Sequence, residues 1–254
     1  MKAKDIASII EAFAPLDTQE SWDNSGFCIG SPEQEVKGVM IGFDCTPALI
    51  EAAIAAGANM VVTHHPLIFS GIKKINPETF VGRCITLAIK HDMVIYSAHT
   101  NADKAEGGVT ALMAQRLGLR DIMPLDETSL ALIGTLPSPL DPQELSEFVK
   151  KTFGIARLRS SRLIKELISR VAICGGSGSS FIPKAIEAGA QLFITGDLSY
   201  HHFFCDEGFM VLDIGHYESE RDIVDKLHDI LSKKFPNFAI HAFMNNNNNP
   251  IFYF

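Results

Sequence analysis

Short apolar runs alternate with amphipathic stretches along most of this chain. A β-branched run at 39–41 is followed by small residues, then by apolar residues three or four positions apart between Leu49 and Ile54. Gly57 ends that predicted helix, and an apolar strand follows at 60–62. Strands that alternate with helices predict an α/β fold with mostly parallel sheets covered by helices.

The same plan occurs a second time. Residues 41–65 align without a gap on residues 173–197, and both copies contain the segment Ile-X-Ala-Gly-Ala where the helix ends. Unrelated units can converge on such a plan. A second match, however, follows in the same order: residues 93–103 align on 210–220, with His on His and Asp on Glu. We therefore expect two intertwined, pseudo-symmetric α/β repeats.

Proline and polar residues mark the boundary between the repeats near Pro124. We expect the first repeat over residues 1–125 and the second over 126–254. A candidate strand at 238–243 has no counterpart in the second repeat, so the tail from about 235 is expected to return to the first.

Composition indicates an ordinary globular protein, with 46% hydrophobic and 20% charged residues. The net charge of -8 argues against a general nucleic-acid or anionic-membrane surface, and a basic stretch at 150–165 is interpreted as a solvated helix face. The five scattered cysteines contain no C-x-x-C pair, which favours core thiols over disulfides or a thiolate zinc site. The N-terminus is typical of an amphipathic helix rather than a signal peptide, so we expect a cytoplasmic location without a membrane span. The asparagine run at 245–249 is interpreted as a polar loop.

Imidazoles and carboxylates gather just after predicted strands. They are His64, His65, His99, Asp103, His216 and Glu220. Functional groups of such sheets lie beyond the carboxyl ends of the strands, and a set without thiolates suits Zn, Fe, Mn or Co. Six potential ligands exceed the three that a single catalytic zinc takes, which favours two divalent metal ions per chain.

The pair His64-His65 ends the first of these strands. Both residues can bind the same metal or one each of two neighbouring metals; a polar turn is the alternative interpretation. The second repeat has Gly196 and Asp197 at the matching positions. One asymmetric site is therefore expected instead of two.

His216 and Glu220 open a segment with the apolar spacing of an amphipathic helix. Residues four apart lie on one face of a helical turn, and a glutamate there can bridge two cations. We interpret both as ligands and Glu220 as the catalytic residue.

Other polar residues are candidates for supporting roles. His99 is interpreted either as a metal ligand or as a residue that contacts and orients a ligand. Asp197, His201 and His202 follow a strand of the second repeat; they either orient ligands or contact substrate, or they cap a helix that begins at Ser199.

A glycine-rich segment at 175–179 lies between a predicted strand and a helix, as phosphate-cradling loops do. It lacks both the Walker ending and the dinucleotide-binding spacing. A small-residue turn that lets the backbone approach the metal pocket is the alternative.

Several of these motifs, in this order, resemble the Nif-three-like dinuclear-metal proteins, the GTP cyclohydrolase I type 2 homologues. The resemblance covers nearly the whole chain and rests on Glu20-Ser-Trp-Asp-Asn-Ser-Gly26, Thr63-His-His-Pro66, His99-Thr-Asn-Ala-Asp103, Gly175-Gly-Ser-Gly178, Thr195-Gly-Asp197 and Gly215-His-Tyr-Glu-Ser-Glu220. It implies one metal on His64, Asp103 and Glu220. It implies a second metal on His65, His216 and Glu220, and a toroidal homohexamer.

The resulting hypothesis is a metal-dependent hydrolase that uses a metal-activated water on a small-molecule or nucleotide-like substrate. The resemblance implies opening of the guanine imidazole ring of GTP with release of formate. The ligand set alone does not choose a substrate, because phosphoester or other C–N hydrolysis uses the same constellation. The alternative hypothesis is a non-catalytic, metal-binding hexameric scaffold or regulatory protein.

Overall fold

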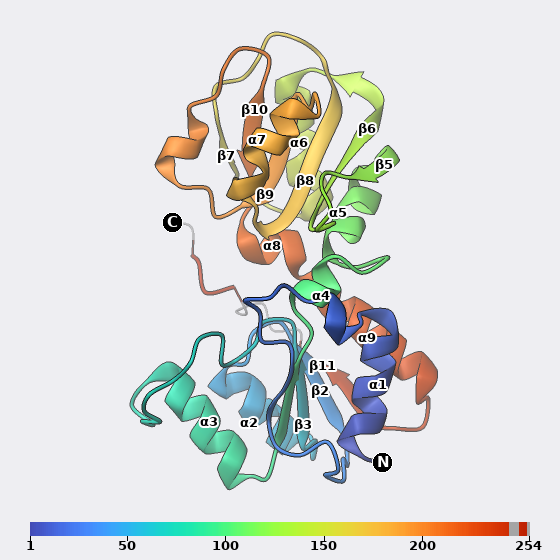
Figure 1. The fold of residues 1–254 in the computed structure, drawn as a ribbon, viewed down its shortest axis with the longest axis vertical. Coiled ribbons are helices and arrows are strands. Elements are labelled where there is room, and N and C mark those ends of the chain that lie inside the picture. The colour runs from blue at the N-terminus through green and yellow to red at the C-terminus, as the bar shows by residue number, and fades with distance from the viewer. Residues whose placement is uncertain (244–248, 253–254) are drawn as a thin grey trace. The chain divides into compact units, whose positions relative to one another are not determined.

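The chain folds into two compact units (Figure 1), and the computed structural model describes residues 1–243 and 249–252. Unit 1 consists of Met1–Ala102 together with Ile223–Phe254, and unit 2 is Asp103–Asp222. The predicted asparagine loop lies, apart from its last residue, outside the described part of the chain. Within the described residues, no helix has the length and apolar character that a membrane span requires.

Unit 1 is built on a five-stranded sheet with the order β1-β4-β3-β2-β11. Its elements are α1 (Ala3–Phe13), η1 (Leu16–Thr18), β1 (Gly26–Ile29), β2 (Val39–Gly42), α2 (Pro47–Ala55), β3 (Met60–Thr63), α3 (Phe80–Lys90), β4 (Val94–Ser97), α4 (Thr100–Asp103), α9 (Asp222–Lys234) and β11 (Ile240–Ala242). All pairings are parallel except that between β1 and β4. Strand β11, near the end of the chain, pairs in parallel with β2.

Helices cover both faces of this sheet (Figure 1). Alternate strand residues such as Val61 and Ile95 pack in one apolar cluster with Leu49 of α2 and Ile85 of α3. The opposite face meets α1, because the hydroxyl of Tyr96 donates to a carboxylate oxygen of Glu11 at 3.1 Å. Apolar residues on both faces explain why the central strands consist of buried residues without polar alternation.

Unit 2 is built on a six-stranded sheet with the order β5-β6-β8-β9-β10-β7. Its elements are α5 (Val109–Leu117), β5 (Arg120–Pro124), β6 (Ala131–Leu140), α6 (Pro142–Phe153), β7 (Arg159–Ser160), β8 (Ile168–Ser177), η2 (Ser179–Phe181), α7 (Ile182–Glu187), β9 (Leu192–Gly196), η3 (Tyr200–Phe203), β10 (Met210–Asp213) and α8 (His216–Glu220). Helices α5 and α6 pack on one face and α7 on the other.

The second sheet is mixed, which corrects the expectation of mostly parallel sheets for this half. Only the pairs β8–β9 and β9–β10 are parallel, whereas β5–β6, β6–β8 and β7–β10 are antiparallel. Strand β6 ends in a segment with Pro137 and Pro139, which reads as loop in the sequence. Proline is tolerated there because the pairing of β6 with β8 is irregular between Thr135 and Leu140.

The structure divides the chain at a different place from the predicted boundary between residues 125 and 126. Met113 and Leu117 of α5 pack in the same cluster as Val171 and Ile173 of β8, so this helix belongs to unit 2. The chain then returns to unit 1 at Ile223 rather than at about residue 235.

The internal repeat is reproduced in the register of the strands. Val39 pairs with Met60 in unit 1, and Val171, at the aligned position, pairs with Leu192 in unit 2. Three parallel strands in each unit therefore share one plan: β2-β3-β4 and β8-β9-β10.

The gapless match between the two His-plus-acid segments is wrong by one residue. Thr63 pairs with Ser97 in unit 1, whereas Thr195, its counterpart, pairs with Asp213 in unit 2. His99 follows Ser97 by two positions, but His216 follows Asp213 by three. The two histidines are not structurally equivalent.

The segment predicted as one amphipathic helix after His216 consists of two helices, α8 and α9. The boundary between the units follows Asp222. Arg221, the C-cap of α8, donates a hydrogen bond to the carbonyl of Phe153 at 2.6 Å, which ties the end of α8 to unit 2.

Candidate metal centre

Three histidines of unit 1 meet at the carboxyl ends of β3 and β4. His64 and His65 follow β3, and His99 follows β4 directly before α4. One ring nitrogen of each lies within 4.8 Å of one ring nitrogen of the other two. His64 is completely buried, whereas His65 and His99 are partly exposed.

Each of these rings is oriented through its Nδ1 atom. Nδ1 of His64 lies 2.8 Å from the carbonyl oxygen of Ala98, which can only accept a hydrogen bond. Nδ1 of His65 lies 2.7 Å from Oδ1 of Asp44, and Nδ1 of His99 lies 2.7 Å from Oδ1 of Asp23. Chemistry thus assigns the proton of a neutral ring to Nδ1 in all three cases, and Nε2 carries the lone pair that a metal binds.

Asp23 is the most constrained of these partners, with a completely buried carboxylate. Burial by itself raises the pKa of this group, but hydrogen bonds from His99 and Thr100 outweigh it and hold the pKa well below its usual value. Ser25 donates a further hydrogen bond at 2.9 Å. Asp23 therefore stays ionised and holds His99 in one orientation.

Unit 2 has its own group of carboxylates and one imidazole. Nε2 of His216 lies 3.0 Å from Oε2 of Glu220, four positions later on α8, as predicted from their spacing. Oxygens of Asp103 and Glu220 lie within 4.8 Å of each other. Glu220 is 4% exposed, so its carboxylate is buried.

The geometry around His216 fits a bound cation. Its Nδ1 atom lies 2.8 Å from Oδ2 of Asp197, which places the ring proton on Nδ1 as in unit 1. Nε2 of the neutral ring then presents its lone pair to an oxygen of Glu220 only 3.0 Å away. Two electron-rich atoms at that distance need a proton or a cation between them, so the donor set suits a divalent metal.

The glycine-rich segment gives Glu220 its space. A Cβ atom on Gly176 would lie 2.3 Å from Oε1 of Glu220, and Gly176 adopts a φ of +57°. The amides of Gly175, Gly176 and Gly178 donate to the hydroxyls of Thr110, Ser219 and Thr195. Hydroxyls of the protein itself thus occupy these donors, which favours the small-residue turn over a phosphate cradle.

The position that matches His64 holds glycine in unit 2 for a steric reason. A Cβ atom on Gly196 would lie 2.7 Å from the backbone nitrogen of His216. Asp213 fixes this close approach: its Oδ1 accepts from the amide of Gly215 at 2.9 Å, and its Oδ2 accepts from the amide of Leu198 at 2.8 Å. Arg159 pairs with the same carboxylate.

The remaining predicted residues divide into two groups. Asp197 contacts His216, as one of its two interpretations requires. The ring of His201 instead packs against Tyr200 and Phe204 on η3, and Nδ1 of His202 lies 3.1 Å from the hydroxyl of Ser199 at the start of that helix. For His202 the geometry favours the capping alternative.

Sequence reasoning missed Asp23 and Asp44 as partners of the histidines. Asp44 lies two residues after the end of β2, so the rule that polar groups gather at strand ends was sufficient to find it. Asp23 lies in a loop, 76 positions from His99, and no local spacing connects the two.

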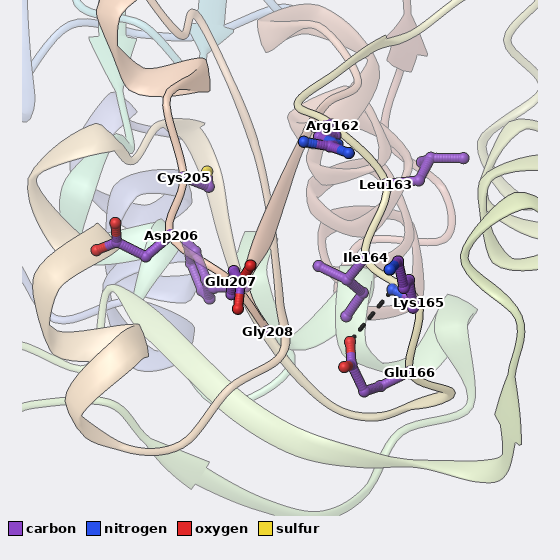
Figure 2. A pocket seen from close by; sticks show the side chains of 10 residues that line it. Arg162, Leu163, Ile164, Lys165, Glu166, Cys205, Asp206, Glu207 and Gly208 are labelled. Carbon is purple, nitrogen blue, oxygen red and sulfur yellow. Dashed lines mark hydrogen bonds between the residues drawn. The ribbon is translucent and has the colours of Figure 1, made fainter.

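A separate depression of about 300 Å³ lies between residues 162–166 and 205–209 of unit 2 (Figure 2). Arg162 and Lys165 line it together with Glu166, Asp206 and Glu207. The lining thus carries both signs of charge, in line with the interpretation of the basic stretch as ordinary solvated surface. The predicted metal ligands are not among the described residues that line it.

Comparison with known proteins gives a consistent result. The model of the family Duf34/NIF3 (NGG1p interacting factor 3) matches residues 1–250. A Clostridium perfringens protein named GTP cyclohydrolase 1 type 2 homolog is 35% identical over 242 residues, which are 92% of each chain. A Nostoc protein with the same name is 37% identical over 237 residues, covering 89% of this chain and 90% of the relative. The crystal structure of a Bacillus cereus protein related to NIF3 has a TM-score of 0.91 at 22% identity and covers 100% of this chain and 99% of its own.

Proposed function

The chain belongs to the Duf34/NIF3 family, and from this premise we propose that it is a metal-dependent hydrolase with two divalent ions per chain. The observation that carries the proposal is the common orientation of four histidines. His64, His65, His99 and His216 each use Nδ1 for a carbonyl or carboxylate partner. This is the arrangement in which Nε2 serves as a metal ligand.

The proposed ligands follow the resemblance: His64, Asp103 and Glu220 for one ion, and His65, His216 and Glu220 for the other. The ions would be zinc, iron, manganese or cobalt, because the donors are nitrogen and oxygen without thiolate. Bound divalent ions would supply Lewis-acid chemistry, lowering the pKa of water and polarising the bond under attack.

The protein's own contribution is to hold these donors before a metal or substrate arrives. Asp44, Asp23 and Asp197 lock three rings, and the carbonyl of Ala98 locks the fourth. Gly176 leaves the space in which the carboxylate of Glu220 lies. Glu220 is the proposed catalytic residue because it is the ligand common to both ions.

The proposed substrate class is a nucleotide, suggested by relatives that carry the name GTP cyclohydrolase 1 type 2 homolog. The reaction to test first is hydrolytic opening of the guanine imidazole ring of GTP with release of formate. A cytoplasmic location and a toroidal homohexamer belong to the same proposal, and sizing of the purified protein tests the hexamer.

The test combines metal content and turnover in matched variants. Protein purified with zinc, manganese or iron should contain close to two ions per chain and should release formate from GTP. Glu220→Gln should lower both, with turnover reduced at least about 100-fold, as expected for loss of a group that acts on the transition state. Glu207→Gln removes an equal charge from an exposed loop position and should change neither.

Two results would overturn parts of this proposal. Metal content near zero after metal-replete purification would refute the metal centre itself. Two ions per chain without turnover of any nucleotide would refute the hydrolase and leave the alternative, a metal-binding scaffold.

A further inference from the structure

Two large aromatic side chains of unit 1 are exposed beside the histidine cluster. Trp22 is 56% exposed and Phe69 is 52% exposed. Their ring centroids lie 5.9 Å apart with an interplanar angle of 62°, so the rings meet at an angle. We call Trp22 and Phe69 together the aromatic wall.

The wall contacts the metal-ligand cluster through His99. The ring centroid of His99 lies 6.3 Å from that of Trp22 and 6.0 Å from that of Phe69. The ring of His99 in turn lies 5.4 Å from each of the rings of His64 and His65. An aromatic group bound on the wall therefore lies beside the proposed metal ligands.

The two loops that carry the wall are tied to each other. The side-chain amide of Asn24 donates to the carbonyl of Ile68 at 2.6 Å, joining the neighbours of Trp22 and Phe69 in sequence. The amide of Asp23 closes a turn on the carbonyl of Glu20 at 2.9 Å, and the buried carboxylate of Asp23 anchors this loop to His99. The wall is thus positioned in advance of binding.

Packing within the protein explains only part of this arrangement. More than half of the surface of each of these two residues remains exposed. Aromatic side chains next to a few fixed polar groups are the usual lining of a small-molecule site. Aromatic faces bind planar rings, because stacking on a π-face suits every nucleobase.

We infer that the aromatic wall binds the planar heteroaromatic ring of the substrate, a purine-like base, and presents it to the histidine cluster. This inference rests on the proposed function for the identity of the reaction, but ring binding itself needs neither metal nor turnover. Trp22 and Phe69 are then the residues that select a base over an aliphatic or sugar group.

The chain offers a direct probe, because Trp22 is its only tryptophan. Guanosine monophosphate should quench the tryptophan fluorescence of the metal-stripped protein in a saturable way. Ribose 5-phosphate, which has the same phosphate and sugar but no base, should leave it unchanged. Phe69→Ala should weaken the binding of guanosine monophosphate by about 10-fold, a typical effect of losing one stacking ring.

Phe80→Ala is the matched control, since Phe80 is 54% exposed and begins α3 of the same unit. It should bind guanosine monophosphate as the parent protein does. Trp22→Phe, measured by calorimetry because the fluorescent group is gone, should bind more weakly while its metal content stays at the parent value.

Three outcomes would overturn the inference. Equal quenching by ribose 5-phosphate would show that the sugar phosphate, not the ring, is recognised. Unchanged affinity in Phe69→Ala would exclude the wall from binding. A tryptophan emission that shifts to shorter wavelength with rising protein concentration, without quenching by the nucleotide, would show that a second copy covers the wall.

The same experiments separate this inference from the proposed hydrolase. If base-dependent quenching occurs but no nucleotide is turned over, the ring site stands and the hydrolase fails. If GTP is hydrolysed with an unchanged KM in Phe69→Ala, the hydrolase stands and the ring site fails.

Discussion

The two units share one arrangement of three parallel strands but carry different polar side chains at the strand ends. The strand ends of unit 1 carry three imidazoles, His64, His65 and His99. The corresponding ends of unit 2 carry Asp197 and, on the helix that follows, His216 and Glu220. The register of β2 with β3 is the same as that of β8 with β9, so the frame does not determine the ligand type.

The difference between the units depends on one inserted residue. The amide of Ala98 donates to the carbonyl of Thr63, and the amide of Ile214 donates to that of Thr195, so Ala98 and Ile214 are equivalent. Gly215, with a φ of +92°, then occupies the place of His99. The additional residue brings the backbone of His216 against Gly196. This contact leaves no space for a side chain at position 196, which corresponds to His64 in unit 1. One additional residue in the loop thus gives the two units different side chains at equivalent strand ends.

Gly196→Ala should have the largest effect on stability, because it tests the steric difference between the two units. The added Cβ meets the backbone nitrogen and Cα of His216 at 2.7 and 2.8 Å, so the loop must move. We expect a loss of about 3 kcal/mol of unfolding free energy, at the upper end of overpacking effects, and a reduced metal content. Urea unfolding and metal analysis measure the two.

Gly189→Ala is the control for that experiment. A Cβ there meets nothing within 4 Å, so only the φ of +75° opposes the substitution, at a cost of about 1 kcal/mol. Equal losses in the two variants would contradict the steric account of Gly196.

Asp23→Asn should test a second difference between the units. Asp23, which orients His99, is completely buried, whereas Asp197, which orients His216, is 49% exposed. The variant loses a buried, ionised acceptor of His99, Thr100 and Ser25, and we expect a loss of about 2 kcal/mol at neutral pH. Because folding lowers the pKa of Asp23, its contribution is complete above about pH 4, the unfolded value. It is lost as the pH falls further towards the folded pKa.

The difference in stability between the parent protein and Asp23→Asn should therefore narrow below about pH 4. Thermal unfolding from pH 7 down to pH 3 measures this. The exposed Asp92→Asn variant serves as a control with no such trend. A difference that stays constant with pH would mean that Asp23 is not the ionised partner.

Asp44→Asn and Asp197→Asn should give the smallest effects. They compare two aspartates that each orient one histidine, Asp44 in unit 1 and Asp197 in unit 2. Each aspartate orients one histidine that we propose as a metal ligand, and losing such a partner weakens metal binding by about 10-fold. Asp44 is 36% exposed and Asp197 is 49% exposed, so the effect should be larger for Asp44. Competition with a chelating dye measures zinc affinity; a larger effect for Asp197 would contradict this ranking.

Much of the fold could be predicted because it depends on local pattern. The apolar periods identified strands and helices of both repeats, and the shared Ile-X-Ala-Gly-Ala segment predicted that the two halves follow one plan. The mixed sheet of unit 2 could not be predicted, because β6 contains Pro137 and Pro139 and lacks the alternation of a strand. The change of unit after Asp222 could not be predicted either, since nothing in the apolar spacing of the amphipathic segment after His216 marks it.

The candidate ligands were visible in the sequence for a similar reason. His64 and His65 directly follow a recognisable strand, His216 comes three residues after another, and the four-residue step to Glu220 is a property of any helical turn. The partner carboxylates were not visible, because Asp23 and Asp44 lie 76 and 21 positions from the histidines they orient.

The sequence by itself determined which residue types gather at the ends of the strands and in what order, since spacing and polarity are properties of the local chain. Only the tertiary structure decided which nitrogen of each imidazole carries the proton and which direction Nε2 faces. That choice depends on a hydrogen bond to Asp23, Asp44, Asp197 or the carbonyl of Ala98, and no local pattern encodes a partner that is brought close only by folding.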